Sequence, residues 1–252
     1  MNALKIKYED SEMILVEKPV GVAVESRRIG EKDMLSIMKT YRVEQGESDY
    51  VGMIHRLDQP VGGLLLFAKT KEAAVKISKQ LQDGTMEKYY QALLHGRIEE
   101  KGELTDYLLR DGRTNISRVV EKGTPGAKMA NLSFRRLKVF SRISLVEIKL
   151  ATGRHHQIRV QMAHHGFPLL GDRKYSLEHP FAFSQCEAHT DAGRPLGHIS
   201  SYPEGAFLPQ EKVHFNGEKF QGPALFAWRL KFRHPKTGKW MDFTEKPPWK
   251  LE

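Results

Sequence analysis

The chain has 252 residues, of which 40% are hydrophobic and 28% charged, as in a globular protein. Its 40 lysines and arginines outnumber 31 acidic residues, and the resulting formal net charge of +9 favours a nucleic-acid partner over an anionic membrane surface. The single cysteine, Cys186, excludes an internal disulfide framework and a cysteine-based metal site.

The N-terminal segment has no features of export. MNALKIKYEDSEMILV contains acidic residues where a secretion signal needs an apolar core, and no later run is long enough to span a bilayer, so we expect a cytoplasmic protein. Residues 13–24 predict a strand, a turn at Lys18-Pro19-Val20-Gly21, and a second strand at 22–24. Because a strand is under way by residue 14, we expect no separate N-terminal RNA-binding module.

Two segments have the spacing of amphipathic helices. Met34 and Met38 lie one turn apart and predict a helix over residues 33–43 that is packed by one face. Thr70 is the predicted N-cap of a second helix, which ends near Asp83-Gly84.

Residues 52–70, GMIHRLDQPVGGLLLFAKT, lie between these helices. The apolar run Leu64–Ala68 predicts a buried strand, and Asp58 precedes it in a turn rich in proline and glycine. Taken alone, Asp58 is better explained as a turn residue that bonds its own backbone than as a catalyst.

Basic and β-rich segments follow. Residues 87–94 predict a strand with one tyrosine facing the core and the other free to face a site. Residues 110–138 carry eight basic and two acidic side chains, with Thr124-Pro125-Gly126 as a loop between strands. A solvated hairpin explains this charge about as well as an RNA groove does.

The segment from residue 146 predicts a strand that leads into a helix. Residues 146–150 alternate as in a half-buried strand, Thr152 is the predicted helix cap, and Gly166 closes the helix. At the first turns of a helix, backbone N–H groups and the dipole favour an anion. Three side chains lie in or next to those turns: Arg154, His156 and Arg159.

The C-terminal third begins irregularly. Residues 176–222 contain scattered proline, glycine and serine, and we interpret them as a long excursion from the core. Alternation over residues 226–232 predicts a strand, residues 234–238 a turn, and Trp240 with Phe243 a last strand.

Several of these segments match one family. They are HRLD at 55–58, GRHHQIRVQMAHHGFPLLGDRKY at 153–175, KPVGVAV at 18–24, EKYYQALLHG at 87–96 and LFAWRLKFRHPKTGKW at 225–240. Together they resemble the RluA family of large-subunit and transfer-RNA pseudouridine synthases, over nearly the whole chain apart from the excursion. Two motifs about a hundred residues apart, in the right order, are far more specific than either alone.

The resemblance implies an α+β pseudouridine synthase fold. We expect a mixed, mostly antiparallel central sheet with flanking helices and a catalytic cleft, built as one domain over residues 1–252. The implied reaction isomerises uridine to pseudouridine and needs no cofactor, because the base is only re-attached through C5 instead of N1. The expected partner is ribosomal or transfer RNA, with no membrane, and the protein is expected to be a monomer.

The resemblance also implies roles for individual residues. Asp58 becomes the nucleophile, attacking the ribose C1′ or the base C6, and Arg159 its counter-ion. Tyr90 stacks on a flipped uracil and assists in removing the C5 proton. Arg56 fills the space that the base vacates or holds the backbone, and the alternative is a simple salt bridge. The expected RNA contacts are His55, Arg56, Arg113, Arg118, Arg135, Arg154 and His156.

The chain departs from the family at two places. It has Val61-Gly62-Gly63 where the family has Thr-Ser-Gly, and His155 where the family has threonine. Because hydroxyls that could order the catalytic turn are missing, the geometry of this turn stays open. Four histidines (His155, His156, His164 and His165) lack the His-Glu-x-x-His pattern, so we expect no metal.

Three alternatives compete with the isomerase. The first is an RNA-binding or ribosome-assembly factor that kept the fold and lost activity, which the altered turn would make conceivable. A glycosidase needs a second acid facing Asp58, and Asp172 is the candidate, although its turn context favours a structural role. A membrane-surface protein would need a cationic amphipathic helix, which the chain lacks.

Overall fold

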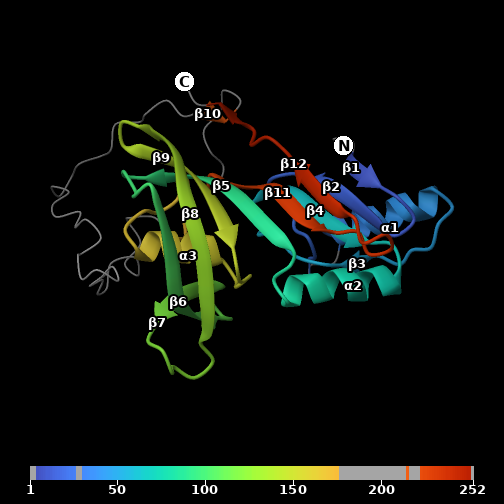
Figure 1. The fold of residues 1–252 in the computed structure, drawn as a ribbon, viewed down its shortest axis with the longest axis horizontal. Helices are drawn as coiled ribbons and strands as arrows, with labels where there is room; N and C mark the ends of the chain where they lie inside the picture. Colours follow the sequence, from blue (N-terminus) through green and yellow to red (C-terminus); the bar gives the residue numbers. More distant parts are fainter. Residues whose placement is uncertain (1–3, 27–29, 176–213, 216–221, 251–252) are drawn as a thin grey trace. The chain divides into compact units, whose positions relative to one another are not determined.

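The computed structural model describes residues 4–26, 30–175, 214–215 and 222–250. The chain forms two compact units (Figure 1). The first contains Met1–Ala92, Glu147–Thr152 and Leu225–Pro247, and the second contains the remaining residues. Strands β5 (Glu87–His95) and β9 (Ile143–Leu150) each begin in one unit and end in the other. The expectation of a single domain with a cleft stays a prediction.

The first unit is built on a mostly antiparallel sheet with the strand order β1-β2-β4-β11-β5. Strand β12 pairs with β11, β3 pairs with β4, and β4 and β11 run parallel to each other. The bounds are Lys5–Glu9 for β1, Met13–Lys18 for β2, Gly52–Met53 for β3, Gly62–Ala68 for β4, Leu225–Arg233 for β11 and Trp240–Thr244 for β12. The predicted strands at 87–94, 226–232 and 240–243 are confirmed.

Both helices of the first unit begin at side-chain caps. Helix α1 (Met34–Glu44) starts after Asp33, which accepts a hydrogen bond from Ser36 N, and Met34 and Met38 are buried as predicted. Helix α2 (Lys71–Gln82) starts after Thr70, whose hydroxyl accepts from Ala73 N at 3.0 Å. Apolar side chains of α2 pack with those of β2, β4 and β11 in one buried cluster.

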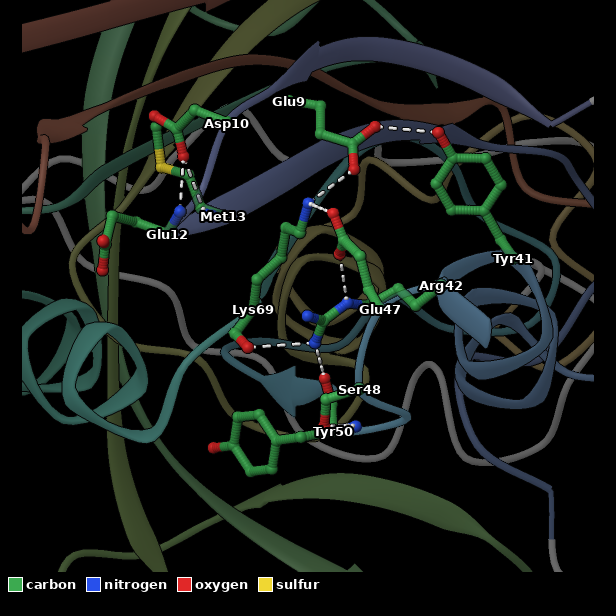
Figure 2. Close-up of polar contacts among 10 residues, drawn as sticks. All are labelled: Glu9, Asp10, Glu12, Met13, Tyr41, Arg42, Glu47, Ser48, Tyr50 and Lys69. Atoms are coloured by element: carbon green, nitrogen blue, oxygen red, sulfur yellow. Dashed lines mark hydrogen bonds and ion pairs between the residues drawn. The ribbon is translucent and has the colours of Figure 1, made fainter. Parts of the chain in front are cut away.

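A charge cluster around two buried cations, Lys69 and Arg42, fixes α1 and the start of the segment that leads to Asp58. Figure 2 shows the Lys69 ammonium between Glu9 and Glu47, at 2.8 and 2.7 Å. The Arg42 guanidinium pairs with Glu47 at 3.0 Å and donates to the backbone oxygens of Lys69 and Tyr50. These contacts join β1, α1, the loop before β3 and the end of β4.

The predicted strand at residues 22–24 is wrong. The carbonyl groups of Ala23 and Val24 accept hydrogen bonds from Met34 N and Leu35 N, at the start of α1, instead of joining a ladder. Helix N-termini have unpaired N–H groups, and this segment satisfies two of them. A sequence pattern cannot show whether a carbonyl group will accept from a helix N-terminus or from a neighbouring strand.

The second unit also contains an antiparallel sheet. Strands β6 (Lys101–Asp111), β7 (Ile116–Val120) and β8 (Lys128–Phe140) follow one another in the chain, but β6 lies between β7 and β8 in the sheet. Residues 110–138 therefore do not form one hairpin around Thr124-Pro125-Gly126. The tight reversal is the turn between β6 and β7, where Asp111 accepts from Arg113 N at 2.8 Å.

Helix α3 (Gln157–His164) begins later than predicted. Its N-cap is His156 in a left-handed conformation, with φ 55°, and Thr152 does not cap it. The intervening loop is held by Gln157, whose side-chain oxygen accepts from Arg154 N at 2.9 Å. Gly166 closes the helix with φ +85°, as predicted, and its N–H donates to Ala163 O.

The rest of the chain adds one short ladder. The predicted excursion at 176–222 lies outside the described residues except for 214–215 and 222. Strand β10 (His214–Phe215) pairs with β13 (Trp249–Lys250), and the sequence predicted neither. Among the described residues, no helix is long and apolar enough to cross a membrane. The α+β fold with a mixed, mostly antiparallel sheet is confirmed.

Candidate active site

Asp58 lies half-buried in the loop between β3 and β4 of the first unit. Its backbone oxygen accepts from Val61 N at 2.9 Å and so closes a turn. The next carbonyl, Gln59 O, accepts from Gly21 N at 2.9 Å and from the Lys18 ammonium at 3.1 Å. The turn that carries Asp58 is therefore fixed by backbone contacts and a lysine, without the hydroxyls that the family pattern would supply.

The glycines after the turn let β4 approach β11 closely. Gly63 has φ +122°, and a Cβ there would lie 2.3 Å from Ala227 O. A Cβ on Gly62 would lie 3.1 Å from Cγ2 of Val20, so a larger residue would have to displace neighbours. Where the family pattern has Thr-Ser, this chain thus has Val61-Gly62 in a tightly packed turn.

Lys18 is a residue of this site to which the sequence analysis assigned no role. It is completely buried, and its ammonium donates to Pro19 O at 2.9 Å and Val22 O at 2.6 Å besides Gln59 O. Burial lowers the pKa of Lys18 to about 7, while the Asp58 carboxylate opposes this shift. The sequence did contain a signal for this role, because Lys18 continues an apolar strand and directly precedes a proline.

Tyr90 lies on β5 and is buried, with 7% of its surface exposed. It is paired across the sheet with Ala227 of β11. Burial raises the pKa of Tyr90, and the charge of Asp58 raises it further. The phenol is therefore protonated at neutral pH, and Asp58 lies close enough to Tyr90 and Lys18 to act on both electrostatically.

The two residues before Leu57 differ in exposure. His55 is buried and its Nε2 accepts from Leu66 N at 3.2 Å, so it supports β4. Burial, together with the charge of Lys88, lowers the pKa of His55 to about 3. Arg56 is exposed and forms no ion pair with any described residue, which disfavours the salt-bridge alternative. Their predicted RNA contacts stay predictions.

In the second unit, Arg159 lies in the first turn of α3. Its guanidinium donates two hydrogen bonds, of 2.7 and 2.8 Å, to the buried Asp172 carboxylate. The guanidinium carbon also lies 5.2 Å from the centroid of the Tyr175 ring. Asp172 also accepts from Lys174 N at 2.9 Å. Asp172 therefore holds Arg159 in place, which makes it a poor second acid for a glycosidase. The ion pair of Arg159 with Asp58 stays a prediction.

His156 and His155 are held by one hydrogen-bonded chain. Ser117 N donates to the Tyr175 hydroxyl at 2.8 Å, which leaves the hydroxyl proton for His156 Nδ1 at 2.8 Å. Ser117 Oγ donates to His155 O, so His155 Nδ1 donates to Ser117 Oγ at 2.8 Å. Burial lowers the pKa of His156, which keeps its ring neutral.

The remaining predicted RNA contacts are exposed. They are Arg113, Arg118, Arg135 and Arg154. Arg154 is anchored by a 2.8 Å hydrogen bond from its Nε to Met129 O. The other two histidines lie on or after α3, where His165 pairs with Asp106 at 3.2 Å. In the described part of the chain, no group of three or more His, Cys, Asp or Glu side chains could hold a metal.

A family model described as RNA pseudouridylate synthase matches residues 12–164, which is more than half of the chain. The chain belongs to the RNA pseudouridylate synthase family. The match contains the turn of Asp58, the strand of Tyr90 and the helix of Arg159.

Relatives support this membership. The chain is 30% identical over 237 residues to ribosomal large subunit pseudouridine synthase D of Nitrosomonas europaea, covering 94% of this chain and 60% of that protein. It is 35% identical over 189 residues to tRNA pseudouridine synthase C of Haemophilus ducreyi, covering 70% and 75%. The chain thus spans only part of the length of these relatives.

The fold of the family is seen in solved structures. The structure of human RNA pseudouridylate synthase domain containing 4 matches with a TM-score of 0.70 over 97% of this chain and 88% of that chain. A second human structure, RNA pseudouridylate synthase domain containing 1, matches with a TM-score of 0.64. Sequence identities are 18% and 21%, so these matches establish the fold alone.

Proposed function

We propose that this protein isomerises specific uridines in RNA to pseudouridine. The observation that carries the proposal is the family match over residues 12–164, because it contains all three predicted catalytic residues. Ribosomal and transfer RNA are both candidate substrates, since the relatives include a ribosomal large subunit enzyme and a transfer-RNA enzyme.

In the proposed reaction Asp58 is the nucleophile. The bond between N1 and C1′ breaks, the uracil turns within its pocket, and C5 forms the new bond to C1′. C5 loses one proton and N1 gains one, so no oxidant or energy source is needed. Asp58 attacks either C1′ or C6, and both routes need a rigidly held carboxylate. Contacts of the turn around Asp58 with Val61, Gly21 and Lys18 support this role.

Tyr90 and Arg159 complete the proposed catalytic group. A buried, protonated tyrosine beside Asp58 offers a flat surface on which a flipped uracil can stack. Arg159, already oriented by Asp172 and Tyr175, supplies the positive charge that keeps Asp58 ionised. The exposed arginines at positions 113, 118, 135 and 154 contact the RNA backbone.

Mapping pseudouridines in total RNA tests the proposal. Cells that lack the gene should lose pseudouridine at one or a few positions, and the wild-type gene should restore them. An Asp58→Asn gene expressed to the same level should not, because the amide is no nucleophile. Full restoration by Asp58→Asn would contradict the enzyme and favour an RNA-binding factor on the same fold.

A further inference from the structure

The first unit buries three lysines, and only one of them has no partner. Lys69 is held by two carboxylates and Lys18 by three backbone carbonyls. The residue Lys88 has 9% of its surface exposed, and its side chain makes no hydrogen bond or ion pair with any described residue. The fully buried side-chain atoms that lack a hydrogen bond in the described residues do not include Lys88 Nζ, so this ammonium keeps contact with solvent and can reach a ligand. A cation at the end of an otherwise buried side chain is costly, so its presence calls for an explanation.

A second unsatisfied donor lies nearby. Because His55 Nε2 accepts from Leu66 N and the ring is neutral, the imidazole proton is on Nδ1. This Nδ1 is buried and has no hydrogen-bond partner among the described residues. Lys88 is close enough for its charge to lower the pKa of His55. A fully buried donor and the ammonium of a largely buried lysine thus lie in one neighbourhood, and no described residue provides an acceptor for either side chain.

The neighbourhood is that of the proposed active site. His55 is three residues before Asp58 in the same loop. On β5 the side chains alternate, so Lys88 and Tyr90 lie on the same face of the strand, about 7 Å apart along it. Both are buried, whereas Tyr89 between them is half-buried. A base stacked on Tyr90 would bring acceptor oxygens within reach of a lysine side chain on that face.

We propose that Lys88 is a further catalytic residue that donates a hydrogen bond to a carbonyl oxygen of the uracil ring. The inference rests on the proposed function. When the bond between N1 and C1′ breaks, its electron pair passes to the ring, and the negative charge spreads onto O2 and O4. Addition of Asp58 at C6 would likewise place charge on O4. The Lys88 ammonium stabilises that charge in either route without giving up its proton.

Uracil is a better ligand for this site than a phosphate. It carries two carbonyl acceptors on a flat ring that fits against Tyr90, and it enters a buried site without bringing a full charge. The charge appears only during the reaction, so the ammonium binds the transition state more tightly than the substrate. His55 Nδ1 can donate to the same ring or to a water that bridges to it.

The test combines atomic substitution in the RNA with substitution at Lys88. A short RNA that contains the uridine modified by wild type is prepared with uridine, 2-thiouridine or 4-thiouridine, since sulfur is a poorer acceptor than oxygen. Wild type should react more slowly when the contacted oxygen is replaced. Lys88→Met should react roughly 100-fold more slowly with uridine and lose that sensitivity to sulfur, and Lys88→Arg should recover part of the rate.

Unfolding by denaturant distinguishes catalysis from structural support. Replacing a largely buried lysine whose side chain has no partner among the described residues should leave the midpoint of Lys88→Met unchanged or raised. The matched control, Lys69→Met, should lower the midpoint, because it leaves Glu9 without its cation and Glu47 with Arg42 alone. A lower midpoint for Lys88→Met, a wild-type rate, or a retained sulfur effect would each overturn the inference. If wild type forms no pseudouridine, the proposed function itself fails and this inference with it.

Discussion

Individual buried charges in the first unit are stabilised in different ways. Lys69 lies between two carboxylates, so its ion pairs offset the cost of burial, and its pKa is raised. Lys18 has only carbonyl oxygens as direct partners, and its pKa falls to about 7. Carbonyl acceptors favour the charged ammonium less than a carboxylate does, so at Lys18 the effect of burial on the pKa dominates. The same residue type therefore responds to pH differently at the two positions.

Lys18 should give the protein a pH-dependent stability. Its pKa is about 7 in the folded chain and about 10.5 in the unfolded chain, so above pH 7 the unfolded chain binds more protons and folding is favoured. From pH 7 to pH 9 the free energy of unfolding of wild type should rise by about 2 kcal/mol relative to Lys18→Met. Urea unfolding at several pH values measures this difference.

Lys69→Met provides the comparison for that experiment. The pKa of Lys69 is raised above 10.5, so its contribution is fully present below that value and constant from pH 7 to pH 9. The difference between wild type and Lys69→Met should therefore not change over this range. A Lys18→Met difference that is equally constant would show that Lys18 stays charged in the folded protein.

At the scale of elements, the approach of β4 to β11 determines where the Asp58 turn lies. Gly63 is the point of contact, and its conformation and surroundings exclude any side chain. The Asp58 turn ends at Val61, whose N–H donates to Asp58 O, only two residues before Gly63. The contact at Gly63 therefore fixes the position of the turn. Packing of two strands thus sets the position of a loop that carries the proposed chemistry.

Gly63→Ala should destabilise the protein by about 3 kcal/mol, because the methyl group meets the Ala227 backbone in addition to the cost of positive φ. Gly84→Ala isolates the second effect. Gly84 has φ +77° and open space around it, so the loss there should be about 1 kcal/mol. Denaturant unfolding of both variants makes the comparison, and equal losses would contradict a close approach at Gly63.

Elements with a local signal were predictable from the sequence. Spacing predicted α1, spacing and the Thr70 cap predicted α2, a β-rich run predicted β5, and alternation predicted β9 and β11. The errors occur where a distant segment decides the outcome. Residues 22–24 bond the start of α1, and β6 inserts between β7 and β8. Neither event leaves a pattern in the residues concerned.

In the candidate site, too, residues within a motif were predictable and contacts between distant segments were not. Asp58, Tyr90 and Arg159 were found because their motifs resemble a family. The contacts that support them were not found, since Lys18 reaches Gln59 across 41 residues and Asp172 meets Arg159 only after the chain has turned at Gly166. Lys88 was noticed only as part of a motif, because the absence of a partner is a property of the folded chain.

At the scale of the whole molecule, the excess positive charge is concentrated in residues 110–138. Seven of its eight basic side chains are exposed, and the eighth, Arg136, donates to Ile98 O. Exposed cations bind a polyanion largely by releasing its counterions, so the affinity depends on salt. This surface should therefore contribute affinity for RNA without selecting a sequence.

The logarithm of the binding constant for RNA should fall linearly with the logarithm of the salt concentration. Replacing Arg113, Arg118 and Arg135 by glutamine should reduce the slope by about 2, for three lost phosphate contacts on a single strand. The control replaces Lys71, Lys76 and Lys79, which are equally exposed on α2, and should leave the slope unchanged. Fluorescence anisotropy at several salt concentrations measures both, and equal slopes for the two triple variants would contradict this surface.

The place of β11 in the first sheet has a consequence for how the protein is made. It pairs with β4 and β5, although it begins at Leu225 and they end by His95. During synthesis the ribosome therefore releases β4 and β5 long before the strand that joins them. Until then both expose unpaired edges, which are targets for aggregation. The turn of Asp58, set by the contact of Gly63 with Ala227, becomes complete only with that late strand.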